Sequence, residues 1–123
     1  MGVTRVILYA RDIDRMVAFY TTHFGYVLSR EPDSDDRLTE LRPKGEGVIL
    51  LLHPAGRGQK QGQVQVKLVF DADDVDTARA ALIAAGLDVG PVHRADGYGF
   101  ANLKDPAGNA IQISGRAARD RGV

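Results

Sequence analysis

The chain has no cysteine and no excess of either charge. Without cysteine there is no disulfide framework, no thiolate nucleophile and no Cys-ligated zinc, and this composition fits a reducing compartment. Sixteen basic residues balance sixteen acidic ones, so the formal net charge is zero. A neutral chain has no general attraction for nucleic acid or for an anionic membrane, so we expect neither as a partner. The expected partners are a small molecule or another protein.

A long hydrophobic run is also missing from the sequence. No N-terminal segment has the form of a signal peptide or of a membrane span, so a cytoplasmic protein is expected. The chain has 123 residues, which is the length of one domain. A chain of this length can bury roughly two-thirds of its unfolded surface. We therefore expect residues 1–123 to form a single domain.

The first half of the chain predicts a strand, a helix and three more strands. Apolar residues alternate along the first strand, 3–9. Asp12 is the expected N-cap of the helix and Gly25 its stop. The pattern then predicts strands at about 26–30, 37–42 and 47–53.

The same order of elements is predicted again after a connector, 54–63, that is rich in glycine and glutamine. Asp74 and Gly86 take the places of the first N-cap and the first stop. The strands predicted for this half are at 64–70, 87–92, 97–103 and 110–114, and a polar tail at 115–123 is expected to add nothing to the core. The chain thus contains two modules, about 3–53 and 64–114, which we expect to bury a joint core.

The stretch KDPAGNAIQIS, residues 104–114, predicts the last hairpin. Asp105 and Pro106 suit the first two positions of a type I turn, and Gly108 can adopt the positive φ that the hairpin requires. After the turn, two isoleucines alternate with small and polar residues. Gln112 is therefore expected to face away from the core.

The D-P-x-G-N turn, set in two tandem βαβββ modules, resembles the vicinal-oxygen-chelate superfamily of glyoxalases, bleomycin-resistance proteins and extradiol dioxygenases. The resemblance covers residues 3–114. It implies an α+β fold in which the two modules form a cup-shaped, partly open barrel of mixed sheet with the helices outside. It also implies a homodimer, whose cups close within one chain or by exchange of modules.

Members of this superfamily hold a catalytic metal with His and carboxylate side chains on the first and last strands of each module. The resemblance places the four ligand positions at Arg5 of RVILYARD, Lys67 of KLVFDADD, Gln112 and Leu51. Arginine and charged lysine offer only hydrogen-bond donors, leucine offers nothing, and Gln112 alone has a carbonyl oxygen. We therefore predict no bound metal and no cofactor.

Two hypotheses of function follow from this departure. The first is a metal-independent protein that binds a small anionic or aromatic molecule in its cup. The second is a glyoxalase-like or dioxygenase-like enzyme, a lyase, isomerase or oxygenase, with an unconventional site. The sequence identifies no catalytic residue. The predicted ligand contacts are the cup-facing residues Arg5, Ile7, Tyr9, Leu51, His53, Lys67, Val69, Tyr98 and Gln112.

Arg5 and Lys67 occupy equivalent positions in the two modules. We predict that they hold a carboxylate or phosphate of the ligand between them, since charge-assisted hydrogen bonds are strong in an apolar wall. The alternative is that they pair with internal acids such as Glu40, or extend to solvent along their aliphatic stems.

Overall fold

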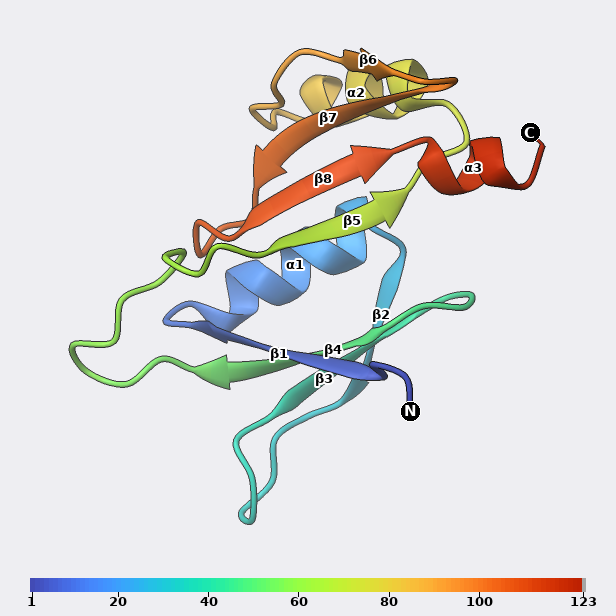
Figure 1. The fold of residues 1–123 in the computed structure, drawn as a ribbon. Helices are drawn as coiled ribbons and strands as arrows, with labels where there is room; N and C mark the ends of the chain where they lie inside the picture. The colour runs from blue at the N-terminus through green and yellow to red at the C-terminus, as the bar shows by residue number, and fades with distance from the viewer. Residues whose placement is uncertain (123) are drawn as a thin grey trace. The chain divides into compact units, whose positions relative to one another are not determined.

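The computed structural model describes residues 1–122 in two units, Met1–Gln63 (unit 1) and the chain from Val64 onward (unit 2) (Figure 1). Unit 1 consists of β1 (Arg5–Ala10), α1 (Ile13–His23), β2 (Tyr26–Arg30), β3 (Thr39–Pro43) and β4 (Ile49–Pro54). Unit 2 consists of β5 (Lys67–Asp71), α2 (Val75–Ala84), β6 (His93–Ala95), β7 (Tyr98–Lys104), β8 (Ala110–Ser114) and α3 (Arg116–Asp120). The prediction of an α+β fold built from two tandem βαβββ modules is confirmed.

The two four-stranded sheets have the same mixed topology, β1-β4-β3-β2 and β5-β8-β7-β6. In each, the first strand lies at the edge and pairs in parallel with the last strand, so that Arg5 lies opposite Ile49 and Lys67 opposite Ala110. The other pairs are antiparallel. Because parallel strands need a long crossover, the helix and two strands of each module lie between the partners in sequence. Neither described sheet closes into a barrel.

Both long helices begin and end where the sequence predicts. Asp12 and Asp74 each accept a hydrogen bond from a backbone N–H of the first turn at 3.0 Å, as N-caps do. Gly25 and Gly86 follow the helix ends with φ of 68° and 92°, a conformation that glycine adopts without steric cost. The helices of the two modules thus have matching start and stop residues.

The core of unit 1 lies between α1 and one face of its sheet. Its most deeply buried side chains are Met16, Tyr20, Leu41, Leu50 and Leu52. Each such side chain contributes roughly 1.5–3 kcal/mol through burial. The strand residues of opposite parity make up the other face, which α1 does not cover and which we call the helix-free face of unit 1.

The core of unit 2 has the same construction under α2. Its strands contribute Ala101, Leu103, Ile111 and Ile113, all buried. Gln112, between the two isoleucines, is half-buried on the opposite face, as predicted. We call that opposite face, which α2 does not cover, the helix-free face of unit 2.

The β7–β8 turn forms as the sequence predicts. The Gly108 N–H donates to the Asp105 carbonyl oxygen at 2.9 Å, and Gly108 has φ of 86°. The Asp105 side chain turns inward, where Oδ1 accepts from the backbone N–H groups of Ala107 and Asn109 at 2.9 Å each and Oδ2 accepts from Asn109 Nδ2 at 2.9 Å. Asp105 is only 4% exposed. Its buried carboxylate fixes which residues of β7 and β8 face each other.

The strand predicted at 87–92 is wrong, because the paired strand of this region is β6, His93–Ala95. The Gly90 N–H donates to the Asn102 carbonyl oxygen at 2.9 Å. The next residue, Pro91, has no N–H with which to continue a ladder. Val89 is nevertheless buried, which explains the apolar pattern without a strand.

The segment after Gly115 is more than the polar tail that was expected. It forms α3 and buries Ala118 in the core of unit 2. Arg121 Nη2 lies 2.9 Å from Asp71 Oδ2 and 3.1 Å from Asp73 Oδ1. A buried alanine and two ion pairs thus join to unit 2 a stretch that was expected to add nothing to its core; residue 123 lies outside the described part of the chain.

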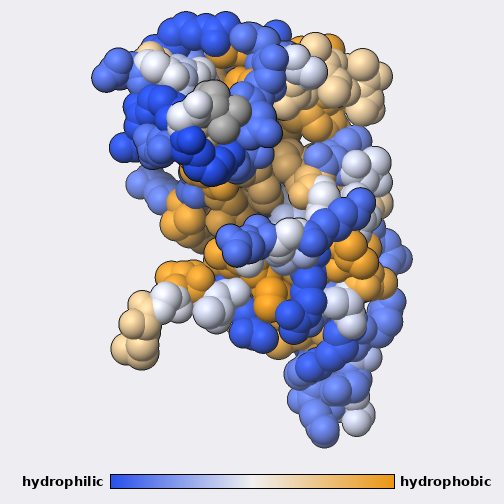
Figure 2. Space-filling view, turned by 90° about the vertical axis from the view of Figure 1, so that its right-hand side faces the viewer, coloured by the Kyte–Doolittle hydropathy of each residue, from blue (hydrophilic) through white to orange (hydrophobic). Residues whose placement is uncertain are grey.

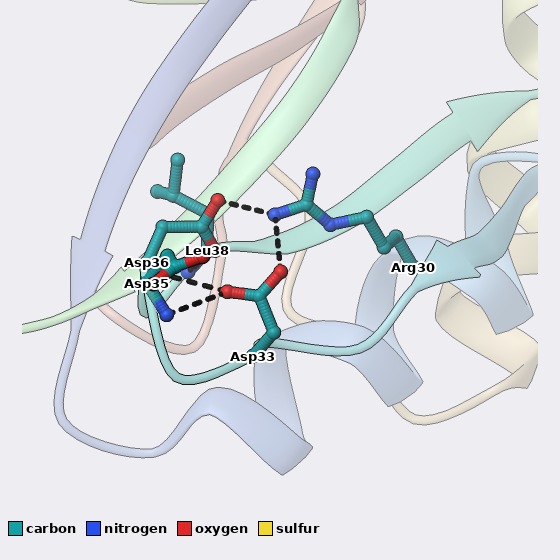
Figure 3. Close-up of polar contacts among 5 residues, drawn as sticks. All are labelled: Arg30, Asp33, Asp35, Asp36 and Leu38. Atoms are coloured by element: carbon teal, nitrogen blue, oxygen red, sulfur yellow. Dashed lines mark hydrogen bonds and ion pairs between the residues drawn. The ribbon is translucent and has the colours of Figure 1, made fainter.

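The acidic β2–β3 turn is organised around Arg30 (Figure 3). The Arg30 guanidinium donates to Asp36 and lies 3.7 Å from Asp33, whose Oδ1 accepts from the backbone N–H groups of Asp35 and Asp36. The hydrogen bond from Arg30 is the main cause that lowers the pKa of Asp36. Among the helices of residues 1–122, none has the length and hydrophobicity that crossing a membrane requires.

Candidate functional site

Five of the predicted ligand contacts share the helix-free face of unit 1. In the parallel β1–β4 pair, Ile7 lies opposite Leu51 and Tyr9 opposite His53, with Arg5 one step before them on the same side. Ile7 and Tyr9 are exposed, whereas Leu51 is buried. The structure thus brings these five residues together as an apolar wall with a cation at one end.

The hydrogen bond of His53 to the backbone determines which of its ring nitrogens carries a hydrogen. Its Nδ1 lies 2.8 Å from the Pro54 carbonyl oxygen, which can only accept, so Nδ1 carries the hydrogen of the neutral ring. The lone pair is then on Nε2, at the tip of the ring, and the ring centre lies 5.1 Å from that of Tyr9. His53 is therefore set up as a hydrogen-bond acceptor beside a phenol.

Glu40 lies opposite Leu51 on β3 and brings an acid to the same face as Arg5. Its carboxylate accepts from the Ser29 hydroxyl at 3.0 Å and from Arg42 Nε at 2.9 Å. The Ser29 hydrogen bond is the main cause that lowers the pKa of Glu40, and the charges of Arg42 and Arg5 act in the same direction against desolvation. The positive charge of Arg5 is therefore partly matched by an acid of its own unit.

The remaining four predicted contacts belong to unit 2. Val69 lies opposite Gln112 in the β5–β8 pair, and Lys67 begins the same strand, so these three share the helix-free face. Tyr98 lies on β7, where the Arg119 guanidinium stacks on its ring at 4.9 Å. Val69 is 60% exposed.

Asn102 is a residue of this face that the sequence did not single out. It lies opposite Gln112 in the β7–β8 pair. Its Oδ1 accepts from Lys67 Nζ at 3.1 Å and from Gln112 Nε2 at 3.0 Å. Because Oδ1 is occupied twice, the Asn102 amide hydrogens, the Gln112 carbonyl oxygen and two hydrogens of the ammonium remain for other partners. We call Lys67, Asn102 and Gln112 the polar triad.

Lys67 differs from Arg5 in its electrostatic surroundings. Within residues 1–122 its ammonium forms no ion pair, and its hydrogen-bond partner, Asn102, is neutral. Of the two alternatives posed by the sequence, pairing with an internal acid does not apply to Lys67. The prediction that one ligand lies between Lys67 and Arg5 joins two separate units and stays a prediction.

The donor set at the four superfamily ligand positions does not suit a divalent metal. Arg5 and Lys67 are cations, Leu51 is buried hydrocarbon, and Gln112 donates its amide hydrogen to Asn102. Across the described residues there is no group of three or more His, Cys, Asp or Glu side chains placed to hold an ion. Imidazole and carboxylate are the usual ligands of such ions, so the residues at these four positions do not fit a divalent metal.

Several large hydrophobic side chains reach the surface in each unit, as the orange areas of the space-filling view illustrate (Figure 2). On the helix-free faces they are Ile7, Tyr9, Val27 and Val69. Apolar surface beside a few convergent polar groups is the usual composition of a small-molecule site. The faces that carry the predicted contacts thus combine exposed apolar side chains with polar groups.

A model of the glyoxalase-like domain family matches residues 5–114 of the chain. Among solved structures, the chain is similar to TnmS3, an antibiotic binding protein from Streptomyces sp. CB03234, with 25% identity, a TM-score of 0.77 and coverage of 92% of this chain and 93% of that one. It is also similar to a lactoylglutathione lyase from Agrobacterium tumefaciens (24% identity, TM-score 0.70, 92% of each chain). A third similar structure is a member of the glyoxalase/bleomycin resistance protein/dioxygenase superfamily from Sphaerobacter thermophilus. It has 20% identity and a TM-score of 0.74, with coverage of 93% of this chain and 96% of that one. No curated protein matches the chain.

Proposed function

The chain belongs to the glyoxalase-like domain family of the vicinal-oxygen-chelate superfamily, and from that premise we propose that it binds a small anion-bearing molecule without a metal. The anionic group of the ligand is held by Lys67 on the helix-free face of unit 2. The observation that carries the proposal is the ammonium of Lys67, which bonds to a neutral amide and to no acid of the described chain.

The polar triad orients this charge. Asn102 fixes the ammonium with one hydrogen bond at 3.1 Å and leaves its other hydrogens for a ligand. Two further amide donors of Asn102 lie beside it, so a carboxylate or phosphate finds several donors at one place. Val69, in the same strand and largely exposed, offers apolar surface to the rest of the molecule. The relative TnmS3, an antibiotic binding protein, supports a binding function without fixing the ligand.

Substituting Lys67 tests the proposal. Titration calorimetry with benzoate and other aromatic acids should show binding by the wild type and a loss of about tenfold or more for Lys67→Met, because a hydrogen bond to a charged group contributes about 1.5–3 kcal/mol. Asn102→Asp keeps the shape of the side chain but places a carboxylate against the ammonium, so it should weaken binding as much. Chelation with EDTA should change nothing.

Two outcomes oppose the proposal. Equal affinity of Lys67→Met and wild type would show that this ammonium does not hold the ligand, and binding that is lost in EDTA and restored by a divalent metal would contradict metal independence. Lys60→Met, in the exposed connector, is the matched control for the loss of one positive charge. It should bind as the wild type does.

An enzyme is the second candidate function, and the geometry of His53 favours it. The Pro54 carbonyl fixes the proton on Nδ1, so Nε2 can accept a proton from a substrate near Tyr9. If the chain is an isomerase or lyase of this kind, His53→Gln should lower turnover by about 10²–10⁴-fold and leave substrate affinity nearly unchanged. A steady-state assay with equal turnover in both proteins would dismiss His53 as the base.

A further inference from the structure

A second lysine lies in the same row of the sheet as Lys67. Lys104 ends β7 and lies opposite Ala110, which in turn lies opposite Lys67 on β5. Residues that face each other across neighbouring strands project from the same side of a sheet. The row Lys104–Ala110–Lys67 therefore crosses the helix-free face of unit 2 with a small residue between two cations.

The spacing of this row suits one doubly charged group. Neighbouring strands lie about 4.8 Å apart, so the two lysine backbones are about 10 Å apart across β8. Each lysine stem is flexible and long enough to bring its ammonium toward the middle. Alanine has one methyl group at that point, which leaves the space above β8 free for a ligand.

The row lines a recess of about 540 Å³. Asn102, Lys67, Lys104 and Ala110 lie along it, and half-buried Leu87 contributes apolar surface. Leu103 and Ile111 also border the recess, but their side chains are buried in the core of unit 2. This volume lies in the range of small-molecule pockets. Gly90, also in the lining, approaches β7 so closely that a Cβ there would lie 3.3 Å from the Asn102 carbonyl oxygen. The 87–90 segment can therefore form the rim of the recess because residue 90 has no side chain.

The charges of the recess favour an anion. Neither lysine forms an ion pair with any residue of the described chain. One acid, Asp88, also lines the recess and is likewise unpaired within residues 1–122, so two cations face one anion. A ligand that brings two negative charges would meet both lysines, whereas a single carboxylate satisfies Lys67 alone.

We propose that this recess binds a phosphate monoester, with the phosphate above Ala110 between Lys67 and Lys104. A phosphate monoester carries close to two negative charges near neutral pH and has three acceptor oxygens, which match two ammonium groups and the Asn102 amide. Leu87, at the rim of the recess, offers apolar contact to the organic part of the ester. The inference rests on the proposed function, because it shares Lys67, and it adds the class of ligand and a second anchoring residue.

The test compares two probes that share a ring and differ in charge, phenyl phosphate and benzoate, by titration calorimetry at fixed ionic strength. The wild type should bind phenyl phosphate about tenfold more tightly than benzoate. Lys104→Met should weaken phenyl phosphate about tenfold and leave benzoate nearly unchanged, since only the phosphate reaches the second lysine. Ala110→Leu, which fills the space between the lysines with a residue that a strand accommodates, should weaken phenyl phosphate at least as much.

The variants separate this inference from the proposal on which it rests. Loss of both probes in Lys67→Met, together with an unchanged preference in Lys104→Met, would keep the anion site and overturn the two-lysine site. Unchanged binding in both lysine variants would overturn both. Failure of the wild type to bind phenyl phosphate at millimolar concentration would also overturn the inference. Lys60→Met is again the charge control, and circular dichroism of each variant confirms that it is folded.

Discussion

Leu52→Ala is expected to lower the free energy of unfolding by about 2–5 kcal/mol, the usual range for a leucine removed from a packed core. Leu52 has no exposed surface and lies on β4, between β1 and β3 and under α1. The substitution leaves a cavity at the point where the parallel and antiparallel pairs of the sheet meet. Urea unfolding followed by circular dichroism should show a lower midpoint with an unchanged slope.

The matched control removes a similar side chain from the surface. Val64 is 71% exposed at the start of unit 2, outside any strand, and Val64→Ala should change the free energy of unfolding by less than about 0.5 kcal/mol. If Leu52→Ala were as stable as Val64→Ala, the packing of α1 on β4 described above would be incorrect.

Asp105→Ala should destabilise the protein by about 2–4 kcal/mol, although it removes no hydrophobic contact. The Asp105 carboxylate accepts from two backbone N–H groups and one side-chain amide while almost fully buried. Alanine leaves these donors unsatisfied, at about 1–3 kcal/mol for each one that water cannot reach. Thermal unfolding should show the loss, and Asp105→Asn, which retains an acceptor oxygen, should recover part of it.

The same substitution also affects the candidate site. The β7–β8 turn fixes Lys104 opposite Ala110 and Asn102 opposite Gln112. A turn that slips by one residue would move these side chains to the other face of the sheet. We therefore expect Asp105→Ala to lose ligand binding along with stability, whereas Asp35→Ala, in the exposed β2–β3 turn, should lose neither.

The parts of the fold that the sequence predicts are those with local causes. Asp12 and Asp74 fix helix starts through hydrogen bonds within three residues, and Gly25 and Gly86 fix the ends. The strand at 87–92 was predicted wrongly because an apolar pattern reports burial, here of Val89, but does not report whether a neighbouring strand accepts the hydrogen bonds.

The hydrogen bonds that join residues of the candidate site likewise depend on contacts between strands. Lys67 and Gln112 were selected because the family resemblance places ligand positions on them, but the amide that joins them, Asn102, comes from a third strand and depends on cross-strand register. A signal for it was available. The Asp105 turn pairs Lys104 with Ala110, and counting outward by two along each strand brings Asn102 opposite Gln112. The joint cup and the homodimer stay predictions.

The parallel pairing of β1 with β4, and of β5 with β8, constrains the order in which each unit can fold. The antiparallel strands of a unit are close in sequence and can pair early. The parallel pairs join residues far apart in sequence, Arg5 with Ile49 and Lys67 with Ala110, so they are expected to form later. During synthesis, β1 therefore emerges from the ribosome long before its partner exists and remains an unpaired, partly apolar strand until β4 is complete. We therefore expect the first strand of each unit to join its sheet last, and the chain to be most exposed in that interval to mispairing with another copy.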